Sequence, residues 1–594
     1  LIAHAEDLKG KQKENVINFA EQGLLSKKLA TIIVDVPLEY DFEDLKVESP
    51  DEEKITNLFA ELEFRNLAKR VLGKEIQIQA AAKNVQGTQM DLFGNDASAE
   101  ENNSTETDDT SVKQKDISNT KHDYQLINTS EQRKKLIQTL SDQSAFCFDT
   151  ETTGINALEV ELVGIAFAYQ AHQAFYVPFP ENQKESKAIL EEFQPLFENK
   201  SIEKIGHNIK YDINVLSNYK VEVKGKIFDT MIAHYLIQPD MRHGMDLLSE
   251  AYLGYKPVSI ETLIGKKGKN QQNMRDLPPE EVVDYACEDA DITLQLKHRL
   301  WQMMDEDQQK VFNDIEAPLV KVLADMEQEG INLDVPTLKK MSKELKELII
   351  KLEKEILDLS GAQFNIDSPK QLGEILFEKL KIVDKPKKTK TGQYQTNEDV
   401  LSKLVNEHEI VPKILEYRTL KKLKSTYVDT LPDLVNPKTN RLHTSYMQTV
   451  AATGRLSSNN PNLQNIPIRD ARGREIRKAF VPRDKNYTLL AADYSQIELR
   501  IIAALSNDKN MISAFKNGED IHAATAAKVF NVSLEEVDRN MRGKAKAVNF
   551  GIIYGVSAFG LSQNLNISRT EAKEIIDTYF EQYPNIKNYM DSSI

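Results

Sequence analysis

Apolar residues between positions 338 and 359 recur every three or four residues, which is the repeat of one face of an α-helix. Asp334 and Pro336 supply a start signal, and Gly361 supplies a stop signal. The apolar positions are Leu338, Met341, Leu345, Leu348, Leu352, Ile356 and Leu359. The pattern predicts a long helix in a helical hairpin or coiled-coil segment, with core packing as the role of its apolar face.

Two short apolar runs end in an acid, as expected of a buried strand that delivers a polar residue. Residues 144–148 lead into Asp149, and residues 488–492 lead into Asp493. Helical spacing then returns at Ile497, Ile501 and Leu505. Strand-like and helical patterns alternate from about residue 123, which indicates a mixed sheet flanked by helices. We therefore predict an α/β chain, and its 594 residues favour several domains.

Two cations and two aromatic residues follow one another at intervals of four: Arg542, Lys546, Phe550 and Tyr554. On a helix this spacing makes one stripe about 18 Å long. With Asn540 as N-cap, the positive helix start would lie beside the cations and suit a triphosphate, and the rings would offer flat faces to a base or sugar. An amphipathic surface helix with a charged shoulder is the alternative interpretation.

Acidic residues also recur in the N-terminal half of the chain, between positions 149 and 289. Asp149 and Glu151 are two apart on a predicted strand, so they share a face, and two like charges so close are costly unless a cation lies between them. Asp212 follows about 60 residues later, and Tyr285 and Asp289 stand at a helical i,i+4 spacing. Each fragment alone is weak evidence for a metal site, because a single Asp-x-Glu is usually a solvated turn.

The amino-acid composition bears on the cellular compartment, on membrane association and on net charge. Two cysteines, Cys147 and Cys287, make neither a disulfide framework nor a metal motif, which favours a reducing cytoplasm. The chain has no run of 18 apolar residues and no signal-peptide pattern at its start, so we expect no membrane association. The net charge is −16, but residues 91–110 hold seven acids and no Lys or Arg, in a polar stretch that reads as a disordered linker.

Two clusters of basic residues carry local positive charge in this acidic chain, although a run of charged residues is usually a solvated face. We leave the first cluster undecided and favour DNA contact for the second, where phosphate contacts would add affinity and salt sensitivity. The first comprises Lys381, Lys385, Lys387, Lys388 and Lys390. The second comprises Lys413, Arg418, Lys421, Lys422 and Lys424.

The segment from Asp493 to Arg500, taken with the stripe, closely resembles the family A DNA polymerases of bacteria. Further family segments follow in family order: Lys422-Leu423-Lys424-Ser425-Thr426-Tyr427, Thr453-Gly454-Arg455-Leu456-Ser457-Ser458, Asn462-Leu463-Gln464-Asn465-Ile466-Pro467 and Asp520-Ile521-His522. The resemblance implies that Asp493 is one of two aspartates that hold a Mg²⁺ pair. It also implies that Glu498 excludes ribonucleotides, that Arg542, Lys546 and His522 hold the triphosphate, and that Phe550 and Tyr554 pack on the sugar and base. Contacts to DNA near the primer terminus are implied for Arg455 and Gln496, and Gln496 is also expected to bind the nucleotide. Asn465 is expected to contact DNA, and Lys422 and Lys424 its phosphates.

In their order and spacing, the upstream acids resemble the 3′→5′ proofreading exonucleases of the ribonuclease-H-like fold. The resemblance implies that two divalent ions, Mg²⁺ with Mn²⁺ able to substitute, are bound by Asp149, Glu151, Asp212 and Asp289, and that Tyr285 orients the attacking water. Asn208 and Ile155 are candidates for gripping the terminal nucleotide, although simple packing explains Ile155 equally well.

The expected fold is therefore a ribonuclease-H-like exonuclease domain followed by an incomplete polymerase right hand. The second palm aspartate of the family has no counterpart before Ile594, and Leu1 opens in what resembles the end of a 5′-nuclease domain, so we expect an internal piece of a longer polymerase. The expected parts are a nuclease-domain remnant (1–75), an acidic linker (76–122), the exonuclease domain (123–305), the thumb region (306–435), a partial palm (436–500) and the fingers (501–594).

Three functions follow. The first belongs to the longer parent protein: template-directed DNA synthesis with 3′→5′ proofreading in replication and repair, acting on primer-template DNA and deoxynucleoside triphosphates, as a cytoplasmic monomer. The second belongs to this chain as given: a metal-dependent 3′→5′ DNA exonuclease without polymerase activity. The third is a non-enzymatic DNA-binding module, against which the complete set of exonuclease acids argues. We expect this chain to shorten 3′ ends and not to extend primers.

Overall fold

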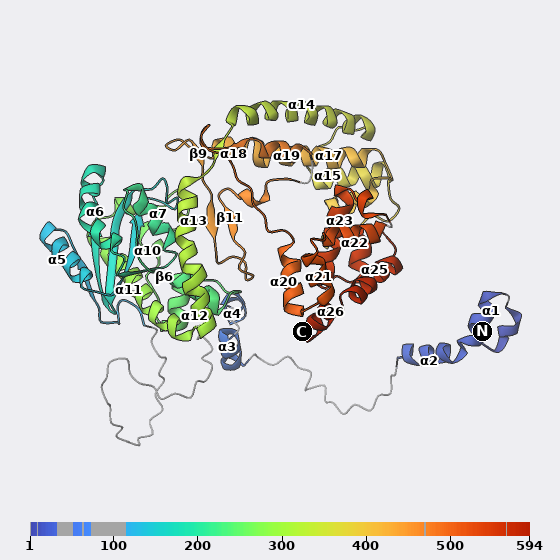
Figure 1. Cartoon of the computed structure of the whole chain (residues 1–594), viewed down its shortest axis with the longest axis horizontal. Helices are drawn as coiled ribbons and strands as arrows, with labels where there is room; N and C mark the ends of the chain where they lie inside the picture. The colour runs from blue at the N-terminus through green and yellow to red at the C-terminus, as the bar shows by residue number, and fades with distance from the viewer. Residues whose placement is uncertain are drawn as a thin grey trace, which may run out of the picture. The chain divides into compact units, whose positions relative to one another are not determined.

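The computed structural model describes residues 2–8, 10–32, 51–61, 65–72, 115–468, 471–530, 532–565 and 567–593 (Figure 1). The chain divides into two compact units, Leu1–Val481 and Pro482–Ile594. The predicted linker at 76–122 lies outside the described residues except for its last eight positions. Before it, the described residues form the short helices α1 (Lys11–Asn18), α2 (Ala20–Ala30), α3 (Glu52–Glu61) and α4 (Arg65–Leu72).

The first unit contains a six-stranded mixed sheet in the order β1-β4-β3-β2-β5-β6. Strand β2 is central, antiparallel to β3 and parallel to β5. The strands are β1 (Asp123–Leu126), β2 (Ala145–Thr152), β3 (Leu162–Gln170), β4 (Gln173–Pro178), β5 (Glu203–Gly206) and β6 (Ile227–Asp229). The mixed sheet predicted from residue 123 onward is therefore confirmed.

Helices flank this sheet, and the longest, α11, packs along strands β1 to β5. Twelve residues of α11 are buried, among them Ala286, Cys287 and Ala290, so the helix lies close to the strands. Both cysteines are buried and free, as small core residues. The helices are α5 (Ser130–Ser141), α6 (Gln183–Glu198), α7 (Lys210–Asn218), α8 (Thr230–Ile237), α9 (Met245–Leu248), α10 (Ile260–Ile264), α11 (Pro279–Met303), α12 (Glu306–Val311) and α13 (Ala317–Glu329).

The predicted long helix is confirmed as α14 (Val335–Ser360), which Asp334 caps and left-handed Gly361 ends. Its residues Leu338, Leu345, Leu352 and Ile356 are buried in a second core, where α14 packs against α17 (Ile410–Leu423). The shorter helices of this region are α15 (Pro369–Glu374), α16 (Glu398–Leu401), α18 (Thr430–Asp433) and α19 (Ala471–Arg477). The short strands are β7 (Asn332–Leu333), β8 (Val435–Asn436), β9 (Arg441–Leu442), β10 (Ser445–Met447), β11 (Ser457–Asn459) and β12 (Phe480–Val481).

The second unit is helical and has its own core, which includes Leu499, Met511, Val548 and Ile552. Its helices are α20 (Ile497–Ser506), α21 (Lys509–Lys516), α22 (Ile521–Phe530), α23 (Arg539–Ile553), α24 (Ala558–Leu565), α25 (Arg569–Gln582) and α26 (Pro584–Ser593). Helix α20 confirms the helical spacing that follows Asp493.

The strand predicted at 488–493 is wrong for this structure. The segment forms neither a strand nor a helix, and Leu490 is 90% exposed. Within the described ranges no strand pairs with it. An apolar run becomes a buried strand only where a neighbouring strand satisfies its backbone groups, which a local pattern cannot reveal.

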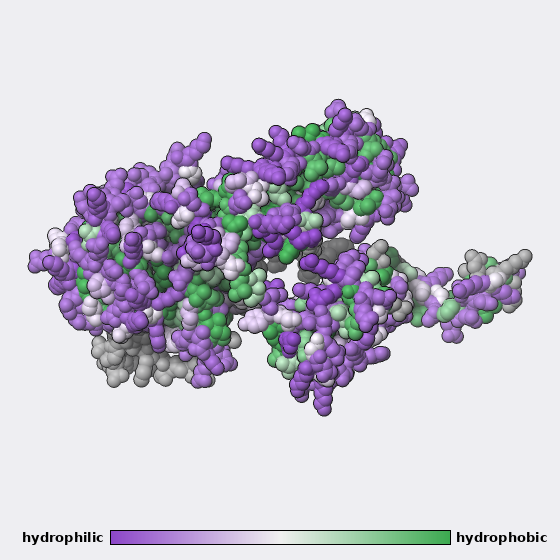
Figure 2. Space-filling model, turned by 45° about the horizontal axis from the view of Figure 1, so that its top comes forward, coloured by the Kyte–Doolittle hydropathy of each residue, from purple (hydrophilic) through white to green (hydrophobic). Residues whose placement is uncertain are grey.

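On the face of the molecule drawn in Figure 2, hydrophilic residues predominate and apolar residues occur in smaller areas. None of the helices in the described ranges is both long enough and apolar enough to span a membrane.

Candidate active site

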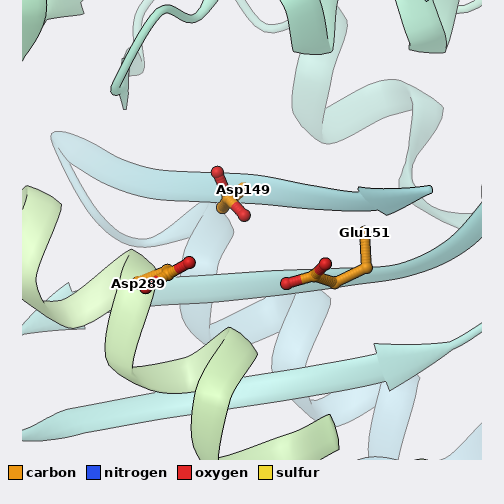
Figure 3. Close-up of side chains that lie close together, drawn as sticks. All are labelled: Asp149, Glu151 and Asp289. Carbon is orange, nitrogen blue, oxygen red and sulfur yellow. The ribbon is translucent and has the colours of Figure 1, made fainter. Parts of the chain in front are cut away.

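Two acids of strand β2 and one of helix α11 meet where this helix packs against the strand. Carboxylate oxygens of Asp149, Glu151 and Asp289 lie within 4.8 Å of one another. Figure 3 shows the three side chains turned toward a shared space, with Asp289 on helix α11. Asp149 and Glu151 are neighbours on one face of β2, as strand geometry requires.

Burial makes this cluster electrostatically costly. Glu151 and Asp289 are 6% and 7% exposed, and Asp149 is partly buried. Loss of solvation raises the pKa of Asp149 to about 7. Loss of solvation and the neighbouring carboxylates raise the pKa of Glu151 and of Asp289 well above the ordinary range.

The cluster fits a divalent cation. Glu151 Oε1 and Asp289 Oδ1 are buried, and neither accepts a hydrogen bond from any residue that the structure describes. Buried acceptors without donors are rare, and hard oxygen ligands are those that Mg²⁺ and Mn²⁺ prefer. A cation held by Asp149, Glu151 and Asp289 would satisfy the orphaned oxygens and offset the repulsion.

Asp212 stands beside this trio rather than within it. It is 2% exposed in the first turn of α7, and its Oδ1 accepts hydrogen bonds from the backbone N (3.0 Å) and Oγ1 (2.5 Å) of Thr150. Desolvation and the charge of Asp149 raise the pKa of Asp212. Sequence reasoning missed Thr150, whose only signal was its place between the two acids of β2.

Tyr285 lies one turn before Asp289 on α11. A hydrogen bond with Tyr285 lowers the pKa of Asp289, although the desolvation of Asp289 outweighs it. Desolvation and the charge of Asp289 raise the pKa of the Tyr285 hydroxyl, so this group keeps its proton at neutral pH. Tyr285 can therefore donate a hydrogen bond but cannot act as a base.

The two candidates for gripping a nucleotide are both at the surface. Asn208 is exposed in a left-handed conformation (φ 56°), and its backbone N donates to Asp229 at 3.1 Å. Asp229 also accepts from Ile209 N at 2.9 Å, so it fixes this turn and is a second residue that the sequence did not reveal. Ile155 is 93% exposed, so packing does not explain it.

In the second unit, Arg542, Lys546 and Phe550 share helix α23, while Tyr554 caps its C-terminal end outside the helix. Phe550 and Tyr554 stack with centroids 6.3 Å apart, and Lys546 Nζ lies 5.7 Å from the Phe550 ring centroid. The N-cap is Asp538, not Asn540 as predicted, because the Asp538 side chain accepts from Met541 N at 2.7 Å.

Two predicted nucleotide contacts are turned inward in this structure. His522 is 2% exposed, shares a 2.9 Å hydrogen bond with Asn549, and has its pKa lowered by desolvation to about 4. Gln496 is the left-handed residue before α20, and its Oε1 accepts from Ile521 N at 3.1 Å. Both side chains have partners within the protein in this structure, and their contacts with a ligand stay predictions.

The remaining residues predicted for the polymerase site include Glu498, Asp493 and Arg542. Glu498 is exposed in the first turn of α20, and Asp493 is exposed before it. Asp493 belongs to no cluster of three metal-ligating residues in the described ranges. Arg542 Nε donates to Asp520 Oδ2 at 2.7 Å, an ion pair that the sequence did not predict.

The second basic cluster is largely engaged within the protein. Lys413 pairs with Glu355 at 2.6 Å and Lys424 with Asp429 at 2.6 Å. Lys421 pairs with Asp367, and Arg418 donates to the Thr396 carbonyl. Lys422 is exposed and forms no ion pair with the residues that the structure describes. Four of the five side chains of this cluster are therefore paired within the protein, and DNA contact by Lys422 and Lys424 stays a prediction.

Arg455 and Asn465 are exposed on the segment around β11. The Asn465 carbonyl accepts a 2.6 Å hydrogen bond from the Tyr427 hydroxyl, so the Lys422–Tyr427 and Asn462–Pro467 motifs are in contact. This contact leaves the Asn465 side chain at the surface.

Comparisons with known proteins match both regions. A family model described as 3′-5′ exonuclease matches residues 124–305, and one described as DNA polymerase family A matches residues 335–594. DNA polymerase I of Pseudomonas aeruginosa is 42% identical over 99% of this chain and 62% of that protein. DNA polymerase I of Bacillus subtilis is 38% identical over 100% of this chain and 62% of that protein. The chain thus spans less than two thirds of these relatives.

A comparison with solved structures also matches a polymerase domain. The POL domain of Pol1 from M. smegmatis, in complex with DNA primer-template and dNTP, matches with a TM-score of 0.69 and 32% identity. The match covers 79% of this chain and 78% of that one. This chain therefore belongs to the family A DNA polymerases, with a 3′→5′ exonuclease domain ahead of its polymerase region.

Proposed function

We propose that this chain removes nucleotides one at a time from the 3′ end of DNA. The observation that carries the proposal is the buried trio Asp149, Glu151 and Asp289, whose orphaned oxygens suit divalent cations. Bound Mg²⁺ or Mn²⁺ would lower the pKa of a water molecule and neutralise charge on the scissile phosphate.

The chain's own residues supply the rest of the chemistry. Asp149, Glu151 and Asp289 would hold the ions, and Asp212, fixed by Thr150, would complete the set. Tyr285 keeps its proton and would orient the water by hydrogen bonding. Asn208 and Ile155 are exposed and would contact the terminal nucleotide.

The test is the shortening of 5′-labelled single-stranded DNA with Mg²⁺. We expect Asp149→Ala/Glu151→Ala to abolish the shortening, because two of the three clustered ligands are lost. The matched control is Asp284→Asn, which removes one exposed charge from α11 and should leave the rate unchanged. Equal shortening by the double variant would show that the site is misassigned.

A second activity, template-directed DNA synthesis, is favoured by the family A match over residues 335–594 and by the stripe on α23. We propose that primer-template DNA and deoxynucleoside triphosphates are the substrates, in replication and repair, and that the protein acts as a cytoplasmic monomer. Lys546 and Arg542 would bind the triphosphate, Phe550 and Tyr554 the sugar and base. Asp493 would bind Mg²⁺, and Glu498 would exclude ribonucleotides.

Triphosphate binding tests this second proposal without requiring primer extension. Lys546→Ala should weaken the binding of a fluorescent deoxynucleoside triphosphate by about tenfold, the effect of one lost charge-assisted contact. Lys544→Ala is the matched control, because Lys544 is exposed on the same helix and lies 5.8 Å from the Phe530 ring. Equal loss in both variants would contradict the assignment of the stripe.

A further inference from the structure

Glu327 of helix α13 is a buried charge shared by two other elements. It is 4% exposed, and its carboxylate accepts hydrogen bonds from Lys210 and Asn214 of α7, the latter at 2.6 Å. The same carboxylate accepts from the backbone N of Tyr446 on β10, also at 2.6 Å. One side chain therefore joins a helix of the exonuclease region to a strand of the polymerase region.

The neighbouring contacts strengthen this junction. Gln328 donates to Asn214 at 2.9 Å and accepts from Ser217, so α13 holds two turns of α7. The Glu327 carbonyl lies 2.7 Å from His443 Nδ1, just before β10. Lys210 and Asn214 are 9% and 3% exposed, so water does not screen the ion pair.

The opposite side of α7 faces the candidate nuclease site. Asp212 lies two residues from both Lys210 and Asn214, about 200° around the helix. On that side it accepts the hydrogen bonds from Thr150, which stands between Asp149 and Glu151. The position of α7, and with it Asp212, is therefore set between Glu327 and β2.

The strand side of the junction leads to a predicted DNA contact. Tyr446 pairs with Ser458 in the β10–β11 hairpin, and the connecting segment carries Arg455. The exonuclease region also holds this segment, because the Tyr235 hydroxyl donates to the Ala451 carbonyl at 2.7 Å and accepts from Gly454 N at 3.0 Å.

We propose that Glu327 is a positioning residue that couples the two regions, fixing Asp212 at the nuclease site and the β10–β11 hairpin for DNA in one arrangement. The inference rests on the proposed exonuclease function for its catalytic consequence. Its structural consequence, that one carboxylate holds both elements, stands independently of catalysis.

Glu327→Met tests this with little change of size. Methionine has no carboxylate, so Lys210, Asn214 and Tyr446 N all lose their shared acceptor. Lys210→Met/Glu327→Met is the second variant, which avoids an unpaired buried ammonium and should fold if the single variant does not. Asp325→Asn is the matched control, because Asp325 is exposed two residues earlier on α13.

The first readout is hydrogen exchange of the full chain without metal. We expect amides of α7 and the Tyr446 amide to exchange on the order of tenfold faster in both Glu327 variants and unchanged in the control. Faster exchange in only one of the two elements, or in neither, would overturn the coupling.

The second readout is function. We expect kcat on single-stranded 3′ ends to fall on the order of tenfold with KM nearly unchanged, through Asp212. We also expect weaker binding of primer-template DNA in EDTA, through the hairpin. A merely structural role would lower the active fraction and leave DNA affinity unaltered, which would contradict the inference.

The two proposals fail in different ways. If the unaltered chain shortens no DNA, the exonuclease assignment is wrong, yet exchange and EDTA binding still test the coupling. If Asp149→Ala/Glu151→Ala abolishes shortening but the Glu327 variants change neither exchange nor DNA affinity, the function stands and the coupling is wrong.

Discussion

Replacing Asp149 by Asn should stabilise the protein in the absence of metal while weakening its response to metal. Asp149 lies in a cluster with Glu151 and Asp289, and its burial raises its pKa from 3.8 to about 7. Above pH 7 the folded protein must therefore hold a carboxylate that is more stable in the unfolded chain. Asparagine removes this charge and keeps the size of the side chain.

The magnitude follows from linkage. A pKa difference of about three units corresponds to about 4 kcal/mol, since one unit corresponds to about 1.4 kcal/mol. The folded pKa is raised, so the destabilisation is absent below about pH 3.8, grows between pH 3.8 and 7, and is constant above. About 4 kcal/mol is an upper limit, because the neighbouring carboxyl groups share protons with Asp149.

The assay is thermal unfolding in EDTA at pH 3.5, 5.5 and 8, following the transition of the exonuclease domain. For a domain of this size, the upper limit at pH 8 corresponds to a rise in Tm of roughly 8–16 °C, with almost none at pH 3.5. Adding Mn²⁺ should raise the Tm of the unaltered protein more than that of Asp149→Asn, because a ligand that binds the folded state stabilises it.

Asp284→Asn serves as the control, because it removes an exposed charge of the same domain. A gain in Tm that is equal at pH 3.5 and pH 8, or a loss of Tm at pH 8 in EDTA, would refute the view that Asp149 is a strained metal ligand. Equal Mn²⁺ stabilisation of both proteins would refute its role as a ligand.

Two further substitutions test the surroundings of the cluster. Thr150→Val should lower the rate of single-strand shortening roughly tenfold, because it removes the 2.5 Å hydrogen bond to Asp212 and keeps the backbone one; an unchanged kcat/KM would exclude this support. Gly164→Ala should cost about 1–3 kcal/mol in urea unfolding, because an added Cβ would lie 2.2 Å from the Tyr176 ring; full stability would show that this ring moves freely.

The spacing of residues along the sequence predicted correctly those features that depend on the helical or strand repeat alone. Helix α14 follows its apolar stripe from Asp334 to Gly361, and Asp149 and Glu151 share a face because strand side chains alternate. The segment ending at Asp493 differs, because an apolar run without a pairing strand has no reason to be buried.

Partners distant in the sequence account for the remaining differences. Lys424 has the same charge whether it meets phosphate or Asp429, and only the fold places Asp429 beside it. Thr150 and Glu327 likewise become visible as supporting residues only when α7 is packed between them. A local sequence pattern can therefore identify a basic or acidic residue, but the tertiary packing decides which partner neutralises its charge.

Incubating 5′-labelled single-stranded DNA with the chain and Mg²⁺ decides whether the buried acids form a nuclease site. We expect the native chain to shorten the 3′ end and Asp149→Ala/Glu151→Ala to leave the strand intact. Unaltered DNA with the native chain, or continued shortening by the double variant, would contradict the assignment of the active site.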